Sequence, residues 1–207
     1  MTKRTRSASN LVHADISFTS WQQTVPTVDE VRPKHCPNCG APAHRPGLPR
    51  QLQGHGLRER QVRGPLTPDG APQVIGLQVR RYRCSRCGST CTVAPREIIK
   101  RRLYSRSAIG LAMLLYGVEA RSQAEVRSRI SPWRHVGAGA SRRWATLNRW
   151  LRAIRDRRLL PYVRRIPAKF TCRAVAERVA TTLAAMACPA LRYSSFAEQV
   201  FSVSHLG

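Results

Sequence analysis

The sequence predicts an α+β protein in which a small β-structured unit precedes an all-helical one. Two strand-like stretches, Gln61–Leu66 and Gln73–Arg83, are separated by the sequence Thr67-Pro68-Asp69-Gly70. Because Pro presets the φ angle of a turn and Gly accepts positive φ, this pattern predicts a long β-hairpin. From Ser105 onward the hydrophobic spacing becomes helical. Two Cys-x-x-Cys pairs bracket the hairpin and indicate a metal that stabilises the β unit.

Composition divides the chain into four segments. Residues 1–30 show little periodicity and are expected to form a loosely ordered leader with a short strand at Ile16–Phe18. Residues 31–95 are rich in Gly, Pro and Arg and carry the β unit. Residues 96–160 are expected to form a helical module, and residues 161–207 a C-terminal helical segment.

Three helices are expected in the helical module. The first follows Ser105 and buries the face made by Ile109, Ala112, Met113 and Tyr116. The second starts at the capping box Ser122-Gln123-Ala124-Glu125 and runs to about Arg129. After the connector Ser131–Ala140, the third begins at the N-cap Ser141 and reaches about Asp156. Its apolar stripe consists of Trp144, Leu147, Leu151 and Ile154.

Two further helices are expected in the C-terminal segment. One covers about Arg173–Ala187 and is stopped by Pro189, and a short one begins at Ser195. The apolar stripe of the longer helix, from Val175 to Met186, can either close the core or mediate a homodimer.

Charge is the strongest compositional signal. The 207 residues include 36 Lys and Arg against 11 Asp and Glu, which gives a formal net charge of +25. Such a chain repels itself unless a polyanion neutralises it, and nucleic acid is the usual polyanion. A GC-rich coding bias would explain why Arg outnumbers Lys, but it would not explain the scarcity of acidic residues.

No membrane or export segment is expected. The longest apolar run, Ala108–Val118, is interrupted by Gly110 and Gly117 and is shorter than the roughly 20 residues that span a bilayer. The first residues carry positive charge with no apolar stretch behind them. Together with the positive charge, these features predict a cytoplasmic, nucleoid-associated location.

The clearest chemical motif is the pair of segments Cys36-Pro37-Asn38-Cys39-Gly40 and Cys84-Ser85-Arg86-Cys87-Gly88. Two residues between cysteines let both thiolates face one ion, and the following Gly permits a tight knuckle. Four thiolates close a tetrahedral shell, so Cys36, Cys39, Cys84 and Cys87 are predicted to hold a structural Zn²⁺ in a zinc ribbon.

Other ligands compete with this set in the sequence. Cys91, His35, His44 and His55 lie close to the two pairs, but the doubled knuckle favours the four named cysteines. A redox-active Cys-x-x-Cys would be expected beside a βαβ pattern, which the sequence lacks. The remaining cysteines, Cys91, Cys172 and Cys188, are interpreted as small hydrophobic residues.

The third helix carries the second motif. Opposite its apolar stripe it presents basic and polar residues that suit a recognition helix in the major groove: Arg142, Arg143, Thr146, Arg149 and Arg152. With the helix before it as support, this arrangement predicts a helix-turn-helix. An amphipathic helix with a merely solvated face is the alternative, although such a face usually includes balancing Glu residues.

A second basic cluster lies between the two units. Lys100, Arg101 and Arg102, flanked by Arg96 and Arg106, are expected to contact the DNA backbone. The sequence pattern indicates no functional role for Trp133 or Trp150.

The order of these motifs resembles the N-terminal region of bacterial insertion-sequence transposases of the DDE class. The resemblance lies in the first knuckle, in His55-Gly56 with Arg58 and Arg60, and in Val79-Arg80-Arg81-Tyr82-Arg83-Cys84. It extends to the third helix and covers roughly residues 31–156. It implies a zinc ribbon followed by a helix-turn-helix that binds the terminal repeats of a mobile element.

The chain departs from that family after the third helix. Family members continue into a nuclease domain whose three carboxylates hold two metal ions. Beyond Arg143 this sequence contains only Asp156, Glu177 and Glu198 as acidic residues. The remaining length is too short for such a domain, so we expect no enzymatic activity.

Three functions are therefore compared. The first is sequence-specific binding of double-stranded DNA by an accessory, a regulator or a truncated transposase of mobile-element origin. The second is a transposase subunit that contributes to strand transfer with another chain. The third is an RNA-binding zinc protein, although recognition of single-stranded RNA usually needs exposed aromatic residues.

Overall fold

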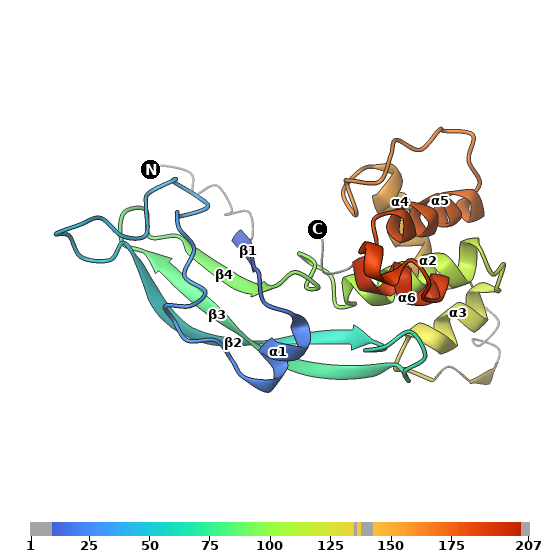
Figure 1. The fold of residues 1–207 in the computed structure, drawn as a ribbon, viewed down its shortest axis with the longest axis horizontal. Helices are drawn as coiled ribbons and strands as arrows, with labels where there is room; N and C mark the ends of the chain where they lie inside the picture. The colour runs from blue at the N-terminus through green and yellow to red at the C-terminus, as the bar shows by residue number, and fades with distance from the viewer. Residues whose placement is uncertain (1–9, 135, 138–142, 204–207) are drawn as a thin grey trace. The chain divides into compact units, whose positions relative to one another are not determined.

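The computed structural model describes residues 10–134, 136–137 and 143–203 (Figure 1). The fold is α+β, as predicted, with one four-stranded mixed sheet and a set of helices. It divides into two compact units. The first contains Met1–Gln61 and Gly76–Arg102, and the second contains Val62–Ile75 and Leu103–Gly207. The hairpin thus contributes its base to the first unit and its tip to the second.

The sheet has the strand order β1-β4-β3-β2. Strand β1 (Asn10–Ala14) pairs in parallel with β4 (Thr90–Pro95), with Asn10 opposite Cys91. Strand β4 pairs antiparallel with β3 (Gln73–Cys84), with Tyr82 opposite Cys91. Strand β2 (Leu52–Gly64) completes the order.

The predicted hairpin is present, but its first strand begins much earlier than expected. β2 starts at Leu52, whereas the prediction placed the strand at Gln61–Leu66. Almost all residues from Gln53 to Gln61 are exposed, so neither face of this stretch is buried. Without a buried face there is no apolar alternation, and the usual sequence signal of a strand is lost.

The leader prediction is wrong for the described residues 10–30. Ile16–Phe18 forms no strand; β1 precedes it, and helix α1 (Phe18–Gln23) follows the N-cap Ser17. Trp21 on α1 is completely buried, and its indole N–H donates to the carbonyl of Gln78 at 2.8 Å. Both elements are stabilised by partners far along the chain, which a local pattern cannot reveal.

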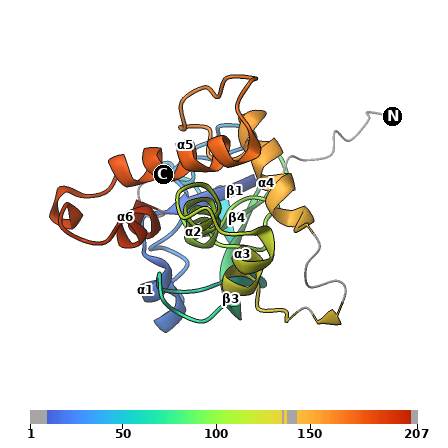
Figure 2. The same cartoon turned by 90° about the vertical axis from the view of Figure 1, so that its right-hand side faces the viewer.

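The second unit is helical. Its elements are α2 (Arg106–Gly117), α3 (Gln123–Ile130), α4 (Ala145–Arg155), α5 (Cys172–Ala185), the 3₁₀ turn η2 (Pro189–Leu191) and α6 (Phe196–Ser202). Helix α2 is central and packs against α3, α5 and α6, as Figure 2 shows with α2 viewed nearly end on. Most of the residues of α2 are buried, and they occur around the whole circumference of the helix. This explains why its sequence is a long apolar run.

Helix α2 approaches α5 closely at Gly117. A Cβ at this position would lie 2.2 Å from the backbone nitrogen of Glu177 and 2.6 Å from the carbonyl carbon of Ala176. No side chain fits in that space, so the two helices can meet here only because residue 117 is Gly.

Several helices begin close to the predicted positions, and the predicted capping box at Ser122 is present. Ser105 caps α2, and both Ser122 and Ser195 form complete capping boxes, with Glu125 and Glu198 respectively. Helix α4 differs: it begins at Ala145 after Trp144, which makes no side-chain cap. The expected N-cap Ser141 lies outside the described residues.

An aromatic cluster explains why α4 starts where it does. The rings of Tyr104, Trp144 and Trp150 meet edge to face, with centroids 5.0 to 6.0 Å apart. The extended backbone of Trp144 (φ −81°, ψ 99°) brings its ring into this cluster, and the helix begins at the next residue. The predicted stripe of Trp144, Leu147, Leu151 and Ile154 is buried as expected, together with Trp150.

Candidate metal centre and basic helix face

The two cysteine pairs form backbone turns of the same design. The N–H of Cys36 donates to the carbonyl of Ala41 (2.7 Å), and the N–H of Cys84 donates to that of Ser89 (2.9 Å). In each turn the Gly N–H donates to the backbone carbonyl of the first cysteine. The distance is 2.9 Å from Gly40 to Cys36 and 2.8 Å from Gly88 to Cys84.

Both glycines have φ of +68°, a left-handed conformation that favours Gly. A Cβ at either glycine would meet nothing within 4 Å, so the requirement for Gly comes from the backbone angle alone. The sequence Cys-x-x-Cys-Gly therefore determines each turn locally.

The turns bring the four predicted cysteines together. Their Sγ atoms all lie within 4.8 Å of one another, with 3.8 Å between Cys36 and Cys87 and 3.8 Å between Cys39 and Cys84. An ion held tetrahedrally at about 2.3 Å from each sulfur would place neighbouring sulfurs about 3.8 Å apart. The cluster therefore has the dimensions of a four-thiolate metal site and could hold an ion.

Hydrogen bonds stabilise the thiolate form of one of the four cysteines. The hydroxyl of Ser89 lies 3.0 Å from the Sγ of Cys87, and the side-chain amide of Asn38 lies 3.7 Å from it. The Ser89 contact is the main cause that lowers the pKa of Cys87 to about 6, against the effect of burial.

A second thiol in the cluster is held protonated. The N–H of Ala41 favours the thiolate of Cys39, but burial and the thiols of Cys87, Cys36 and Cys84 outweigh it and raise the pKa of Cys39 to about 11. Four thiolates this close repel one another, and a divalent cation would remove that repulsion.

The competing ligands are not part of the group. Among the described residues, the four cysteines are the one set of three or more His, Cys, Asp or Glu close enough to share an ion. His35, His44 and His55 are exposed. Cys91 is buried on β4, and this burial raises its pKa to about 11, so it stays a thiol.

The interpretation of the other cysteines as small packed hydrophobic residues is right only for Cys91. Cys172 and Cys188 are exposed. Cys172 is the first residue of α5 and Cys188 precedes η2, so neither lies on the buried side of a helix.

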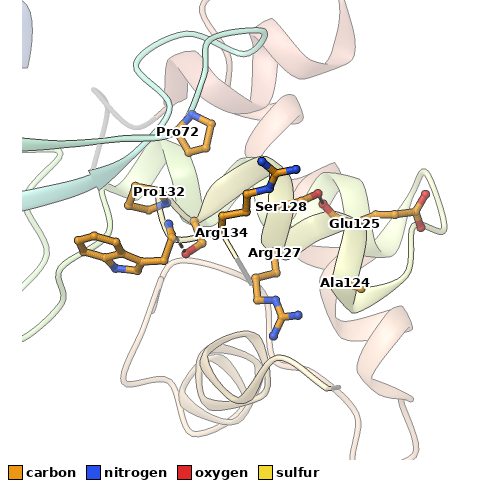
Figure 3. Close-up of a pocket in the computed structure, with 9 residues that line it drawn as sticks. Pro72, Ala124, Glu125, Arg127, Ser128, Pro132 and Arg134 are labelled. Atoms are coloured by element: carbon orange, nitrogen blue, oxygen red, sulfur yellow. Dashed lines mark hydrogen bonds between the residues drawn. The ribbon is translucent and has the colours of Figure 1, made fainter. Parts of the chain in front are cut away.

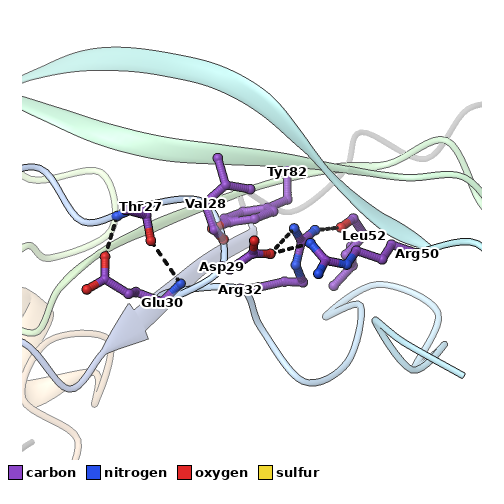
Figure 4. A network of polar contacts seen from close by, with 8 residues as sticks. All are labelled: Thr27, Val28, Asp29, Glu30, Arg32, Arg50, Leu52 and Tyr82. Carbon is purple, nitrogen blue, oxygen red and sulfur yellow. Dashed lines mark hydrogen bonds and ion pairs between the residues drawn. The ribbon is translucent and has the colours of Figure 1, made fainter. Parts of the chain in front are cut away.

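A polar network fixes the segment that leads into the first knuckle (Figure 4). Arg32 donates to the carbonyl of Leu52 and to Asp29 (2.7 Å), and its guanidinium lies 5.6 Å from the ring centroid of Tyr82. The Tyr82 hydroxyl donates to the carbonyl of Val28 at 2.6 Å. These contacts anchor residues 28–32 to β2 and β3, and through them position Cys36.

Helix α4 presents a basic outer face, as predicted. Arg143, Arg149 and Arg152 are exposed and Thr146 is half-buried, whereas Arg142 lies outside the described residues. The Arg149 guanidinium donates to the Thr146 hydroxyl at 3.2 Å. In the part of the chain that the structure describes, no ion pair joins Arg149 or Arg152 to an acidic residue.

The N-terminus of α4 is held by α3 through Gln123. The Gln123 Oε1 accepts from the backbone N–H of Trp144 at 2.8 Å and faces the side-chain amide of Asn148 at 3.4 Å. The Gln123 amide in turn donates to the Asn148 Oδ1 at 3.3 Å. The sequence pattern places Gln123 only within a capping box, and its role at α4 depends on a tertiary contact.

The second basic cluster lies in the first unit, on the turn after β4. Lys100 and Arg101 are exposed, Arg102 is half-buried, and Arg101 adopts the left-handed φ of 58°. Arg60 on β2 holds this turn, because its guanidinium donates to the carbonyls of Ile99 (3.1 Å) and Arg102 (3.4 Å). Burial and the neighbouring Arg58 lower the pKa of Arg60. The positioning role of Arg60 has no signal in the sequence.

None of the described helices is both long and apolar enough to cross a membrane. Comparison of the chain with protein-family models, curated proteins and solved structures found no significant match.

Proposed function

We propose that the chain binds double-stranded DNA, with a structural Zn²⁺ in the first unit and helix α4 of the second unit in the major groove. The basic outer face of α4 carries this proposal. Its arginines are exposed above a fully buried stripe and, among the described residues, are not neutralised by carboxylates.

The proposed zinc is structural because the ligand set is closed. Cys36, Cys39, Cys84 and Cys87 would fill a tetrahedral shell and leave no position for water or substrate. Zinc would link the knuckle before β2 to the knuckle after β3, and so would stabilise a sheet whose outer strand buries few side chains.

Helix α4 would act as the recognition helix of a helix-turn-helix, with α3 as its support. Gln123 and Asn148 set the position of α4 against α3, while Arg149 and Arg152 face outward. Arg binds guanine and phosphate bidentately, so this face suits both base edges and the backbone. In the first unit, Lys100 and Arg101 would add phosphate contacts.

The origin in a mobile element rests on the resemblance to transposase N-terminal regions. In this proposal the chain is an accessory, a regulator or a truncated transposase, without catalysis of its own. Two of the late acidic residues have structural roles: Asp156 pairs with Arg158, and Glu198 completes a capping box.

The test is selection of bound duplexes from a random DNA pool, followed by binding measurements at several salt concentrations. We expect an enriched motif and an affinity that falls steeply with salt, because many phosphates are neutralised. Weak binding that is equal for all sequences would contradict the recognition role of α4. A structured RNA that outcompetes the selected duplex would favour the RNA-binding alternative. Metal-dependent DNA cleavage by the purified chain would favour a transposase subunit.

A further inference from the structure

A pocket of about 570 Å³ lies in the second unit beside helix α3 (Figure 3). Its apolar walls come from Pro72, Pro132, Trp133 and Ala124. Arg127 and Arg134 also line it. Flat apolar walls beside guanidinium groups suit a ligand that is planar and apolar on its faces and carries negative charge at its edge.

Trp133 is unlike the other three tryptophans. Trp21, Trp144 and Trp150 are 0%, 6% and 2% exposed, whereas Trp133 is 53% exposed. The guanidinium of Arg63 lies 5.5 Å from the ring centroid of Trp133, which places a cation against this exposed ring. An indole with half its surface in water is available for stacking.

The pocket is built by contacts between distant parts of the chain. Arg129 on α3 donates to the carbonyls of Gly70 (2.5 Å) and Pro68 (2.7 Å) at the tip of the hairpin. These bonds hold the tip against α3 and make Pro72 a wall of the pocket. On the opposite side, the backbone N–H of Trp133 donates to the Ser131 hydroxyl at 3.3 Å, just after α3 ends.

The charges around the pocket favour an anion. Arg134 lines it and is exposed, whereas Arg127, only 6% exposed, adds positive charge to its wall. The one acidic lining residue, Glu125, already accepts from the Ser122 N–H at 2.8 Å and lies 3.7 Å from Arg121.

We propose that this pocket accepts an unpaired DNA base, which stacks on Trp133 while a flanking phosphate contacts the exposed Arg134. The inference rests on the proposed function and deepens it: besides duplex sequence, the protein would recognise an extrahelical or single-stranded nucleotide. Stacking on an aromatic ring tolerates any base, so the preference would be for an unpaired nucleotide and not for its identity.

The test compares two DNA duplexes of the same sequence, one fully paired and one with a single unpaired thymine. Binding of each is measured for the unmodified chain and for the variants Trp133→Ala, Trp133→Phe and Tyr193→Ala. Tyr193 is 92% exposed in the same unit and lines no part of this pocket, so Tyr193→Ala controls for the loss of any exposed aromatic residue.

We expect Trp133→Ala to weaken binding of the bulged duplex about tenfold and to leave the paired duplex nearly unchanged. Trp133→Phe should keep most of the affinity, and Tyr193→Ala should behave as the unmodified chain. The tryptophan fluorescence of the unmodified chain should be quenched by the bulged duplex, and this quenching should vanish in Trp133→Phe.

Equal losses on both duplexes, or none on either, would overturn the stacking role of Trp133. Binding of the paired duplex with no preference for the bulged one would overturn the inference while leaving the proposed function in place. Failure to bind either duplex would overturn both.

Discussion

The side-chain carbonyl of Gln123, at the start of α3, accepts a hydrogen bond from the backbone N–H of Trp144 at the start of α4, at 2.8 Å. Helix α4 makes no side-chain cap of its own. The position of the proposed recognition helix therefore depends on a residue of its supporting helix.

Replacing Gln123 should weaken DNA binding through the geometry of α4. In Gln123→Ala the Trp144 N–H and the Asn148 amide lose their partner, which should cost about 1 kcal/mol of unfolding free energy. Chemical denaturation followed by circular dichroism measures this loss, and Gln22→Ala on α1 is the exposed control. Unchanged stability together with unchanged DNA affinity would show that the contact does not position α4.

Arg149→Ala should weaken binding of the selected duplex by about 1–3 kcal/mol, since a bidentate contact to a base or phosphate would be lost. Arg192, exposed near α6, provides the matched charge control as Arg192→Ala. Binding isotherms by fluorescence anisotropy distinguish the two. If both variants lose the same amount of DNA affinity, the net charge of the chain and not the face of α4 governs binding.

The chain should contain one zinc ion, and Cys84→Ser should abolish it. Removal of one thiolate leaves an open, weaker shell and should unfold the first unit, because the metal supplies part of its folding free energy. Elemental analysis and circular dichroism report the two effects. Cys172→Ser, at an exposed cysteine outside the cluster, should keep the metal. A metal-free chain that keeps its β-sheet signal would contradict the structural role.

Metal affinity should rise with pH. Without an ion, the Ser89 hydroxyl holds the pKa of Cys87 at about 6, while that of Cys39 is raised to about 11. At neutral pH Cys87 is largely thiolate, but Cys39 must release a proton when the ion binds, so protons compete with the metal. The apparent dissociation constant should fall at least about tenfold per pH unit near neutrality. Competition with a chromophoric chelator measures it, and a constant value would contradict the ligand set.

Gly117→Ala should destabilise the second unit. The added methyl group would lie 2.2 Å from the backbone nitrogen of Glu177, so α2 and α5 would have to separate. Overpacking of this kind costs about 1–3 kcal/mol, and backbone contact places the loss at the upper end. Thermal unfolding tests this against Gly76→Ala, at an exposed glycine of β3 whose added methyl group would meet only the flexible end of the Glu59 side chain, 2.8 Å away. An unchanged midpoint in Gly117→Ala would show that the helices can move apart freely.

The sequence by itself determined the features that depend on neighbouring residues. Each knuckle follows from a Cys-x-x-Cys-Gly segment, because the left-handed glycine closes the turn within a few residues. The capping boxes at Ser122 and Ser195 are equally local, since each involves one side chain and the residue three positions on. The buried stripe of α4 follows from helical periodicity alone.

Only the tertiary structure decided the remaining features. Three contacts join segments that lie far apart in the chain. They are the parallel pairing of β1 with β4, the packing that buries Trp21, and the hydrogen bonds from Arg60 to the turn at residues 99–102. The exposure of Trp133 and the burial of Trp150 are of the same kind, because the residue type is identical and only the neighbours in space distinguish the two. A residue type and its spacing specify local hydrogen bonds and periodic faces, but burial and long-range pairing are set by which distant surfaces meet.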